Sequence, residues 1–179
     1  LYNTILITAA FYLFFITLRD FFHRKYRNLS QITAHFSFSI LILSILFNNI
    51  FSSEVITNLK INETYQAQNL KINFESIEQE NKQNFKAIRG KFIVEDQSGL
   101  IEVMQPELRI YNQPNIVTSE ADIKTNIFTD KFITMNHVQN QDYFNIRYQV
   151  KPFMIWIWIS TILLCFSGCL SLIKKKYEN

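Results

Sequence analysis

QITAHFSFSILILSILFNNIF, residues 31–51, is an apolar stretch with a single histidine near its beginning. Residues 32–51 contain no Asp, Glu, Lys or Arg. At about 1.5 Å per residue, a helix of this length crosses the roughly 30 Å hydrocarbon layer of a bilayer. We therefore expect a membrane-spanning helix over residues 32–51. His35 is then an ionisable side chain inside a span, which indicates a functional site by default.

Two further segments have the length and composition of a span. Residues 151–173 carry no charge after Lys151, and we expect the helix to open there because the proline that follows loses no hydrogen bond in a first turn. Residues 1–22 are apolar as far as Leu18, and the basic residues follow this run instead of preceding it. That order favours a membrane helix over a secretory signal.

The charges on either side of the expected spans indicate a topology. The connection 19–31 contains four basic residues and one acidic residue, and the tail 174–179 begins with three lysines. Inner-side segments are enriched in Lys and Arg, so we place the basic loop 23–31 and the tail inside. The segment 52–150 has ten basic and thirteen acidic residues, a net charge of −3 (10 − 13) that fits the outer side. The overall charge of +3 therefore reflects topology and requires no nucleic acid.

The outer segment 52–150 alternates apolar and polar residues with a period of two, which is typical of half-buried strands. Turn-forming residues at 96–99 and 112–115 separate the alternating runs. We therefore expect three transmembrane α-helices with an antiparallel, β-rich domain of about 100 residues between the second and the third. The alternating runs are Leu70, Ile72 and Phe74; Phe92 and Val94; Ile101 and Val103; residues 107–111; and Phe144, Ile146 and Tyr148.

Two compositional features bear on the compartment and on redox chemistry. Phenylalanine is abundant and glycine and proline are scarce, with 17, 3 and 3 residues. This usage points to an AT-rich genome, either a mitochondrial one or that of a reduced bacterium. The cysteines, Cys165 and Cys169, lie four apart in the third expected span, and we interpret them as small buried thiols in preference to redox or metal-binding groups.

Four short motifs occur in an order and spacing known from one family. They are Ala34-His35, PELRIY at 106–111, TSEA at 118–121 and KPFMIWIW at 151–158. The chain resembles the C-terminal part of CcmF, the haem lyase subunit of the multi-component cytochrome c maturation system. The corresponding family motifs are AHxG, PEKRxY, TEA and KPFxxWIW. The chain departs from them at Ser37, where the family has glycine, and in PELR for PEKR.

The resemblance implies that His35 is one of two histidines that hold a b-type haem (haem b) within the membrane. Its chemistry agrees, because a neutral imidazole is a good axial ligand for haem iron. Its other nitrogen needs an acceptor, for which Gln31 and Ser39 lie one turn away. The second ligand is expected from another chain, since His23 falls in the inner loop and His137 in the outer domain. The alternative is a histidine hydrogen-bonded to a neighbouring helix.

The chain lacks the tryptophan-rich WWD segment that the family uses for haem, so the resemblance implies the C-terminal piece of a split haem lyase. Expected partners are the N-terminal chain bearing that segment, other cytochrome c maturation subunits, apocytochrome c and the lipid bilayer. The expected location is the mitochondrial inner membrane with the main domain in the intermembrane space, or alternatively a bacterial inner membrane with that domain in the periplasm. A non-catalytic structural or assembly subunit is the other interpretation, and no catalytic residue is expected in this chain.

Three other side chains are weaker candidates for contact with haem. Arg109 shares a strand face with Glu107 and Tyr111, where it could clamp a haem propionate or form a surface ion pair. Trp156 and Trp158 open the third span, where indoles anchor helices at the outer interface. Shaping the partner's haem site is the alternative role for the two tryptophans.

Overall fold

The structure is a computed structural model that describes residues 2–23, 29–67, 70–96, 99–138 and 142–178. The chain folds into two compact units. The first, here called the helical unit, consists of Leu1–Ser52, Asn126–Asp130 and Lys151–Asn179. The second, the β unit, consists of Ser53–Thr125 and Lys131–Val150.

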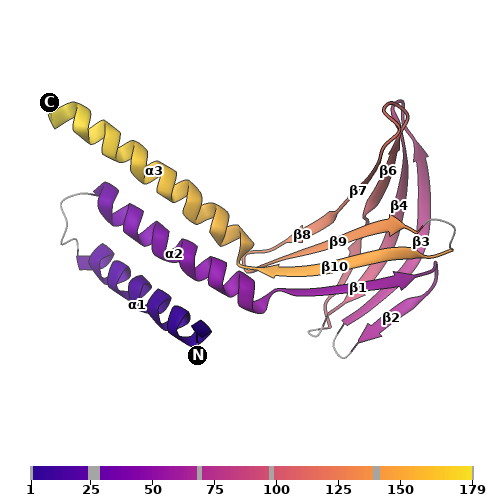
Figure 1. The fold of residues 1–179 in the computed structure, drawn as a ribbon, viewed down its shortest axis with the longest axis horizontal. Helices are drawn as coiled ribbons and strands as arrows, with labels where there is room; N and C mark the ends of the chain where they lie inside the picture. Colours follow the sequence, from indigo (N-terminus) through magenta and orange to yellow (C-terminus); the bar gives the residue numbers. More distant parts are fainter. Residues whose placement is uncertain (1, 24–28, 68–69, 97–98, 139–141, 179) are drawn as a thin grey trace. The chain divides into compact units, whose positions relative to one another are not determined.

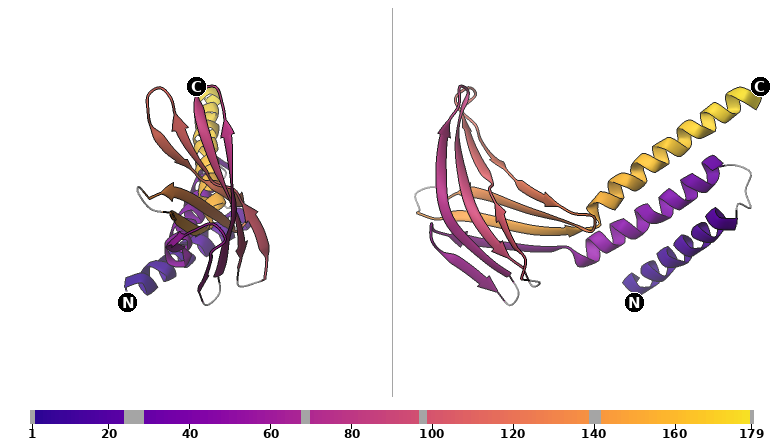
Figure 2. Two further views of the ribbon diagram at one scale, coloured as in Figure 1. Left: turned by 90° about the vertical axis from the view of Figure 1, so that its right-hand side faces the viewer. Right: turned by 180° about the vertical axis from the view of Figure 1, so that it is seen from behind.

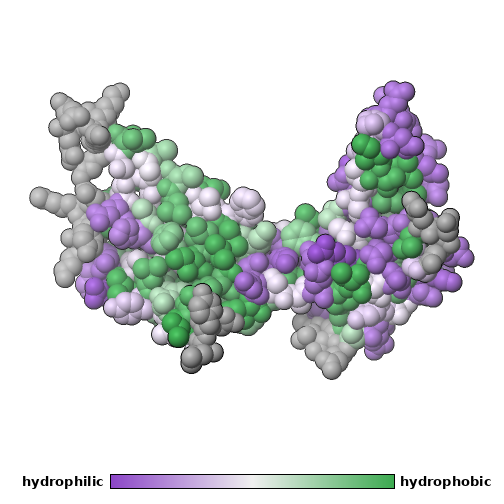
Figure 3. Space-filling view, viewed as in Figure 1, coloured by the Kyte–Doolittle hydropathy of each residue, from purple (hydrophilic) through white to green (hydrophobic). Residues whose placement is uncertain are grey.

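The helical unit contains α1 (Tyr2–His23), α2 (Leu29–Phe51) and α3 (Met154–Glu178), and α2 packs between the other two (Figure 1). Each helix is long and apolar enough to cross a membrane, and its surface is largely hydrophobic (Figure 3). The prediction of three transmembrane helices is confirmed. By contrast, Cys165 and Cys169 are exposed on α3, so the expectation of buried thiols is wrong.

Some element bounds differ from those expected from the sequence. α3 begins at Met154 and not at 151, because Lys151 and Pro152 form the end of the last strand. Its backbone continues as helix to Glu178, through most of the expected tail. α2 begins at Leu29, and residues 24–28 of the expected inner loop lie outside the described residues.

Small polar side chains allow the helices to approach closely. Ser37, Ser39 and Ser160 are fully buried, and such small residues are typical of contacts between membrane helices. The Ser30 hydroxyl of α2 donates to the Ser167 carbonyl of α3 at 2.8 Å. This hydrogen bond between a side chain and the backbone therefore joins α2 to α3 where lipid offers neither donor nor acceptor.

The β unit is an antiparallel sandwich of two sheets, seen from two further directions in Figure 2. One sheet has the order β1-β10-β9-β8, and the other has the order β2-β3-β4-β6-β7 with β5 paired to β4. This arrangement confirms the predicted β-rich domain. The strands are β1 (Ser53–Leu59), β2 (Thr64–Ala67), β3 (Leu70–Asn81), β4 (Phe85–Glu95), β5 (Ile101–Met104), β6 (Glu107–Tyr111), β7 (Val117–Glu120), β8 (Asp122–Thr125), β9 (Thr129–His137) and β10 (Phe144–Pro152).

The core of the β unit lies between the sheets, where alternate residues of each strand point inward. Phe74 and Phe92 stack with their ring centroids 4.4 Å apart, and Ile133 and Ile146 are fully buried around them. The first strand pairs with the last along its whole length, from Ser53↔Val150 to Leu59↔Phe144. The sandwich is therefore an insertion whose two ends leave it side by side.

A charged side chain is also buried in the β unit. Lys131 on β9 has a side chain that is 10% exposed, and its ammonium lies 2.9 Å from the Asp96 carboxylate and 2.6 Å from that of Glu102. Burial lowers the pKa of Lys131, but the hydrogen bonds to Glu102 and Asp96 outweigh it and leave the pKa raised. Lys131 is therefore held as a cation by two carboxylates that are distant from it in the sequence, one just after β4 and one in β5.

Candidate functional site

His35 lies on a face of α2 that the rest of the helical unit leaves open. Gln31, His35, Phe38, Ile45 and Asn49 are all exposed, and their spacing places them on one side of the helix. We call these five residues the open stripe. In a bilayer this stripe faces either lipid or another molecule, and an imidazole facing hydrocarbon has no hydrogen-bond partner.

A small pocket borders His35 where α2 meets α1. It is lined by Thr17 and Asp20 of α1 and by Gln31, Ile32 and His35 of α2, with a volume of about 50 Å³. Asp20 was not predicted as a site residue, because an acid at the end of a span is usually a solvated boundary residue. Its side chain is mostly buried beside Arg19, with 3.3 Å between the charged groups. The pocket therefore brings a carboxylate close to the imidazole.

Of the two acceptors proposed for the second ring nitrogen of His35, only Gln31 lines this pocket. The Ser39 hydroxyl is buried, donates to the Phe36 carbonyl at 2.7 Å and lies 2.9 Å from the Thr17 hydroxyl. Within the described ranges no hydrogen bond joins the His35 ring to a neighbouring helix. Both ring nitrogens are therefore available to an incoming group.

The space beside His35 limits how a haem could bind. A pocket that encloses a ligand of that size measures roughly 300 Å³ or more, several times the 50 Å³ found here. The imidazole suits iron ligation, but the macrocycle would have to lie against the open stripe with its other side covered by a second molecule. The residues present therefore fit half of a haem site.

The other two histidines lie elsewhere. His23 ends α1, and its Nδ1 is 2.9 Å from the Arg19 carbonyl oxygen. His137 ends β9, and its ring packs against Phe144 with the centroids 5.2 Å apart. Neither belongs to the open stripe, so His35 is the candidate ligand that this chain offers within its second span.

A larger cavity in the helical unit is apolar. It has a volume of about 310 Å³ and is lined by five phenylalanine rings, by Trp156 and by Ile40, Leu43 and Ser44 of α2. Its lining contains no histidine, cysteine, methionine or carboxylate, which are the side chains that bind metals. This cavity can hold an apolar group but provides no iron ligand.

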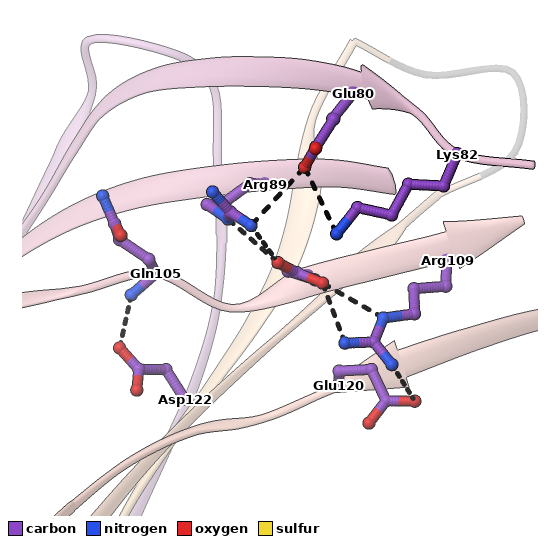
Figure 4. A network of polar contacts seen from close by, with 8 residues as sticks. Glu80, Lys82, Arg89, Gln105, Arg109, Glu120 and Asp122 are labelled. Carbon is purple, nitrogen blue, oxygen red and sulfur yellow. Dashed lines mark hydrogen bonds and ion pairs between the residues drawn. The ribbon is translucent and has the colours of Figure 1, made fainter. Parts of the chain in front are cut away.

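Arg109 lies in an ionic network on the larger sheet of the β unit (Figure 4). The Glu107 carboxylate accepts hydrogen bonds from Arg89 and from Arg109, whose Nε lies 3.1 Å away. Arg109 also lies 3.9 Å from Glu120, and its guanidinium carbon is 5.2 Å from the centre of the Phe85 ring. The guanidinium is thus already engaged by two carboxylates and an aromatic face.

The network stabilises its charged forms. The hydrogen bond from Arg89 is the main cause of a lowered pKa at Glu107, against which burial acts in the opposite direction. The hydrogen bond to Glu107 likewise raises the pKa of Arg89 and that of Arg109. A carboxylate held between two guanidiniums is typical of a structural ion-pair network.

Residues 50–152 match the model of the CcmF C-terminal beta-sandwich family. The chain belongs to this family. The matched segment contains every strand listed above, so the CcmF sandwich is the whole of the β unit together with its junctions to α2 and α3.

Individual members of the CcmF family agree over a wider range. The chain is 30% identical over 120 residues to the cytochrome c-type biogenesis protein ccl1 of Rhodobacter capsulatus. The aligned segment is 67% of this chain and 18% of that protein. It is 23% identical over 167 residues to CcmF of Haemophilus influenzae, covering 90% of this chain and 26% of that protein. The chain thus spans between about a fifth and a quarter of the length of these relatives.

A solved structure described as cytochrome c heme lyase CcmF has the same fold. It matches 79% of this chain and 24% of its own chain, with a TM-score of 0.62 and 16% identity.

Within the CcmF motif KPFMIWIW, the two tryptophans differ in their surroundings. The Trp156 indole donates to the Ile127 carbonyl at 2.9 Å, whereas Trp158 projects from α3 and is exposed.

Proposed function

We propose that this chain is the C-terminal part of a cytochrome c haem lyase and that His35 supplies one axial ligand of a b-type haem held in the membrane. The observation that carries the proposal is an imidazole on the open stripe of a spanning helix in a chain of the CcmF family. Because the chain covers only 18–26% of its relatives, the remaining wall of the haem site and the second ligand would come from a partner bearing the WWD segment.

The reaction proposed for the whole assembly is the attachment of haem to a CxxCH apocytochrome. Each cysteine thiol adds its S–H across a haem vinyl group, which forms one carbon–sulfur and one carbon–hydrogen bond and requires no external oxidant. A haem held in the membrane would provide a redox centre between an inner-side or quinol electron donor and the delivered haem. In this chain His35 would hold and orient that haem, and other maturation subunits would bring the substrates.

The ionic network argues against a direct role for Arg109 in haem binding. Its guanidinium is already bound by Glu107 and Glu120, so capture of a propionate would require one of these pairs to break. Trp156 is likewise engaged with Ile127. Of the side chains considered in this chain, His35 is therefore the one we propose as a contact to haem, with Trp158 free to face a partner.

We propose the mitochondrial inner membrane as the location, with the β unit in the intermembrane space, on the basis of residue usage and of the charges that flank the spans. The alternative is a bacterial inner membrane with the β unit in the periplasm. It is favoured by the sources of the relatives, which include Rhodobacter and Haemophilus.

The ligand role is tested by replacing His35 with alanine and measuring b-type haem absorbance in the complex purified with its partner chain. We expect the absorbance to be lost while the two chains still purify together. Matched His23→Ala and His137→Ala variants should keep it, because neither residue lies on the open stripe. Unchanged absorbance in His35→Ala would rule out the ligand role and leave a structural or assembly subunit as the function.

A further inference from the structure

The β8–β9 hairpin ends in a tip, Asn126–Asp130, that belongs to the helical unit although the strands on either side belong to the β unit. Two large apolar residues stand at its end. Ile127 is 62% exposed and Phe128 is 61% exposed. Exposed side chains of this size at a turn are unusual in water, where turns are mostly polar.

The carbonyls of Ile127 and Phe128 and the N–H groups of Phe128 and Thr129 are all hydrogen-bonded within the helical unit. The Asn126 side-chain oxygen accepts from the backbone N–H groups of Phe128 and Thr129, at 2.9 and 2.7 Å. The Trp156 indole donates to the Ile127 carbonyl at 2.9 Å, and the Phe153 N–H donates to the Phe128 carbonyl at 2.7 Å. These bonds reduce the number of backbone polar groups at Ile127 and Phe128 that would lose a water partner in an apolar environment.

The contacts of the tip place it at the start of a membrane span. Phe153 immediately precedes the span Met154–Ile173, and Trp156 lies in its first turn. Phe153 has a positive φ of 60°, a conformation that bulky residues rarely adopt, and in it the backbone N–H meets Phe128. The backbone at Phe153 therefore adopts an uncommon conformation in which its N–H forms a hydrogen bond to the tip.

The surroundings favour lipid over water as the neighbour of the two side chains. Further along α3, Ile162 is 67% exposed at the middle of a helix that is apolar enough to span a membrane, so in a bilayer this surface has apolar surroundings. Asp130, the last residue of the tip, is buried, whereas Ile127 and Phe128 are exposed. Aromatic and aliphatic side chains next to an interfacial tryptophan are typical of segments that lie at the headgroup boundary.

We propose that the tip inserts Ile127 and Phe128 into the membrane leaflet in which α3 begins, as a lipid anchor of the sandwich hairpin. The two side chains then contact phospholipid at the boundary between headgroups and acyl chains. The anchor requires no haem and no partner chain. A test of the anchor is therefore independent of a test of the function proposed above.

The test measures the depth of a fluorescent label in the full chain, reconstituted in phosphatidylcholine vesicles, with Cys165 and Cys169 replaced by alanine. A nitrobenzoxadiazole label is placed on Phe128→Cys or, independently, on Ile127→Cys, whose backbone carbonyl still holds Trp156. Ile162→Cys serves as the deep reference, because it is exposed at mid-span. Lys86→Cys, on an exposed position of β4, serves as the aqueous reference.

We expect labels on the tip to lose emission to phosphatidylcholine brominated near the carbonyl end of its acyl chain and to resist aqueous iodide. The Ile162 label should respond most to bromine at mid-chain, and the Lys86 label to iodide. Iodide quenching at both tip positions, as at Lys86, would overturn the proposal. Protection of both from bromolipid and from iodide would overturn it too, since it would show that protein covers the tip.

Discussion

The hydroxyl oxygens of Thr17 and Ser39 lie 2.9 Å apart in a buried position between α1 and α2. Each hydroxyl also lies within hydrogen-bond distance of a carbonyl of its own helix, Thr17 of the Phe14 carbonyl at 2.9 Å and Ser39 of the Phe36 carbonyl at 2.7 Å. Because each hydroxyl has one proton, one of the two donates across the interface while the other donates within its own helix, and neither is exposed to lipid.

Ser39→Ala and Thr17→Val, alone and combined, test this contact. We expect the double-mutant cycle to give a coupling free energy of about 0.6 kcal/mol, a typical value for such bonds in membranes. The measurement is unfolding of the full chain in mixed micelles by sodium dodecyl sulfate, followed by circular dichroism. Thr8→Val is the control, because its hydroxyl bonds only within α1 and is exposed. A coupling of zero would show that the hydroxyls do not interact.

Glu107→Gln should destabilise the β unit at neutral pH and flatten its response to acid. The Glu107 side chain is 15% exposed between two guanidiniums, and losing charged hydrogen bonds of this kind costs about 2 kcal/mol. Because its pKa is lowered in the folded state, the wild type keeps this stability above the ordinary glutamate pKa and loses it as the pH falls through the lowered value. The variant should lack that acid-dependent loss.

The measurement for Glu107 is guanidinium unfolding of the full chain in detergent micelles across a pH series. Asp142→Asn is the matched control, since Asp142 is exposed and should change neither the stability at neutral pH nor the acid response. Equal behaviour of the two variants would contradict a structural role for the network around Glu107.

Tyr148→Phe should stabilise the protein slightly at neutral pH and more strongly at alkaline pH. The Tyr148 hydroxyl is buried and has no hydrogen-bond partner within the described residues, and removal of such a group should yield about 1 kcal/mol. Burial raises the pKa of Tyr148 to about 12. The folded wild type should therefore lose stability as the pH rises from the ordinary tyrosine value through about 12, and the variant should not.

The alkaline effect at Tyr148 is measured by unfolding at a series of pH values up to that range. Tyr12→Phe is the control, because Tyr12 is exposed on α1. The proposed origin of the effect would be wrong if the control and Tyr148→Phe responded equally to alkali.

Gly90→Ala and Gly168→Ala form a matched pair with opposite expected outcomes. A Cβ atom at Gly90 would lie 2.6 Å from a ring carbon of Phe92 and 2.8 Å from the Met135 sulfur, whereas one at Gly168 meets nothing within 4 Å. Overpacking at Gly90 should cost about 1–3 kcal/mol. Gly168→Ala should be neutral or stabilising, because alanine favours a helix. Thermal unfolding of both variants gives the comparison, and an unchanged midpoint for Gly90→Ala would disprove the tight contact.

Much of the sandwich was predictable from the alternation of apolar and polar residues, which identified β3 to β6 and β10. β1, β2 and β7 to β9 were not predicted. β9 was missed because its buried positions include Lys131 beside Ile133 and Met135. A lysine at a position expected to be apolar interrupts the alternation of apolar and polar residues. It is tolerated because Asp96 and Glu102 surround its ammonium, and a single sequence does not show that these distant residues meet.

The membrane part shows the same limit at its junctions and at the candidate site. Lys151 and Pro152 look like the first turn of a helix, but they end β10, and the Pro152 carbonyl is bound by the Asn48 side chain at 2.7 Å. The position of His35 in a span followed from the sequence. Its place on the open stripe beside Asp20 depends on how α1 packs against α2, which apolar segments of similar composition do not specify.

The pairing of Ser53 with Val150 at the base of the sandwich has a consequence for biosynthesis. The ribosome completes α2 long before it completes α3, and about a hundred residues of non-local sheet must be joined between these events. Because β10 ends at Pro152 and α3 begins at Met154, almost no linker separates the final strand from the third helix. Folding of the insert therefore depends on a strand that is synthesised last, and a nascent chain stalled before residue 144 would leave β1 without its β10 partner.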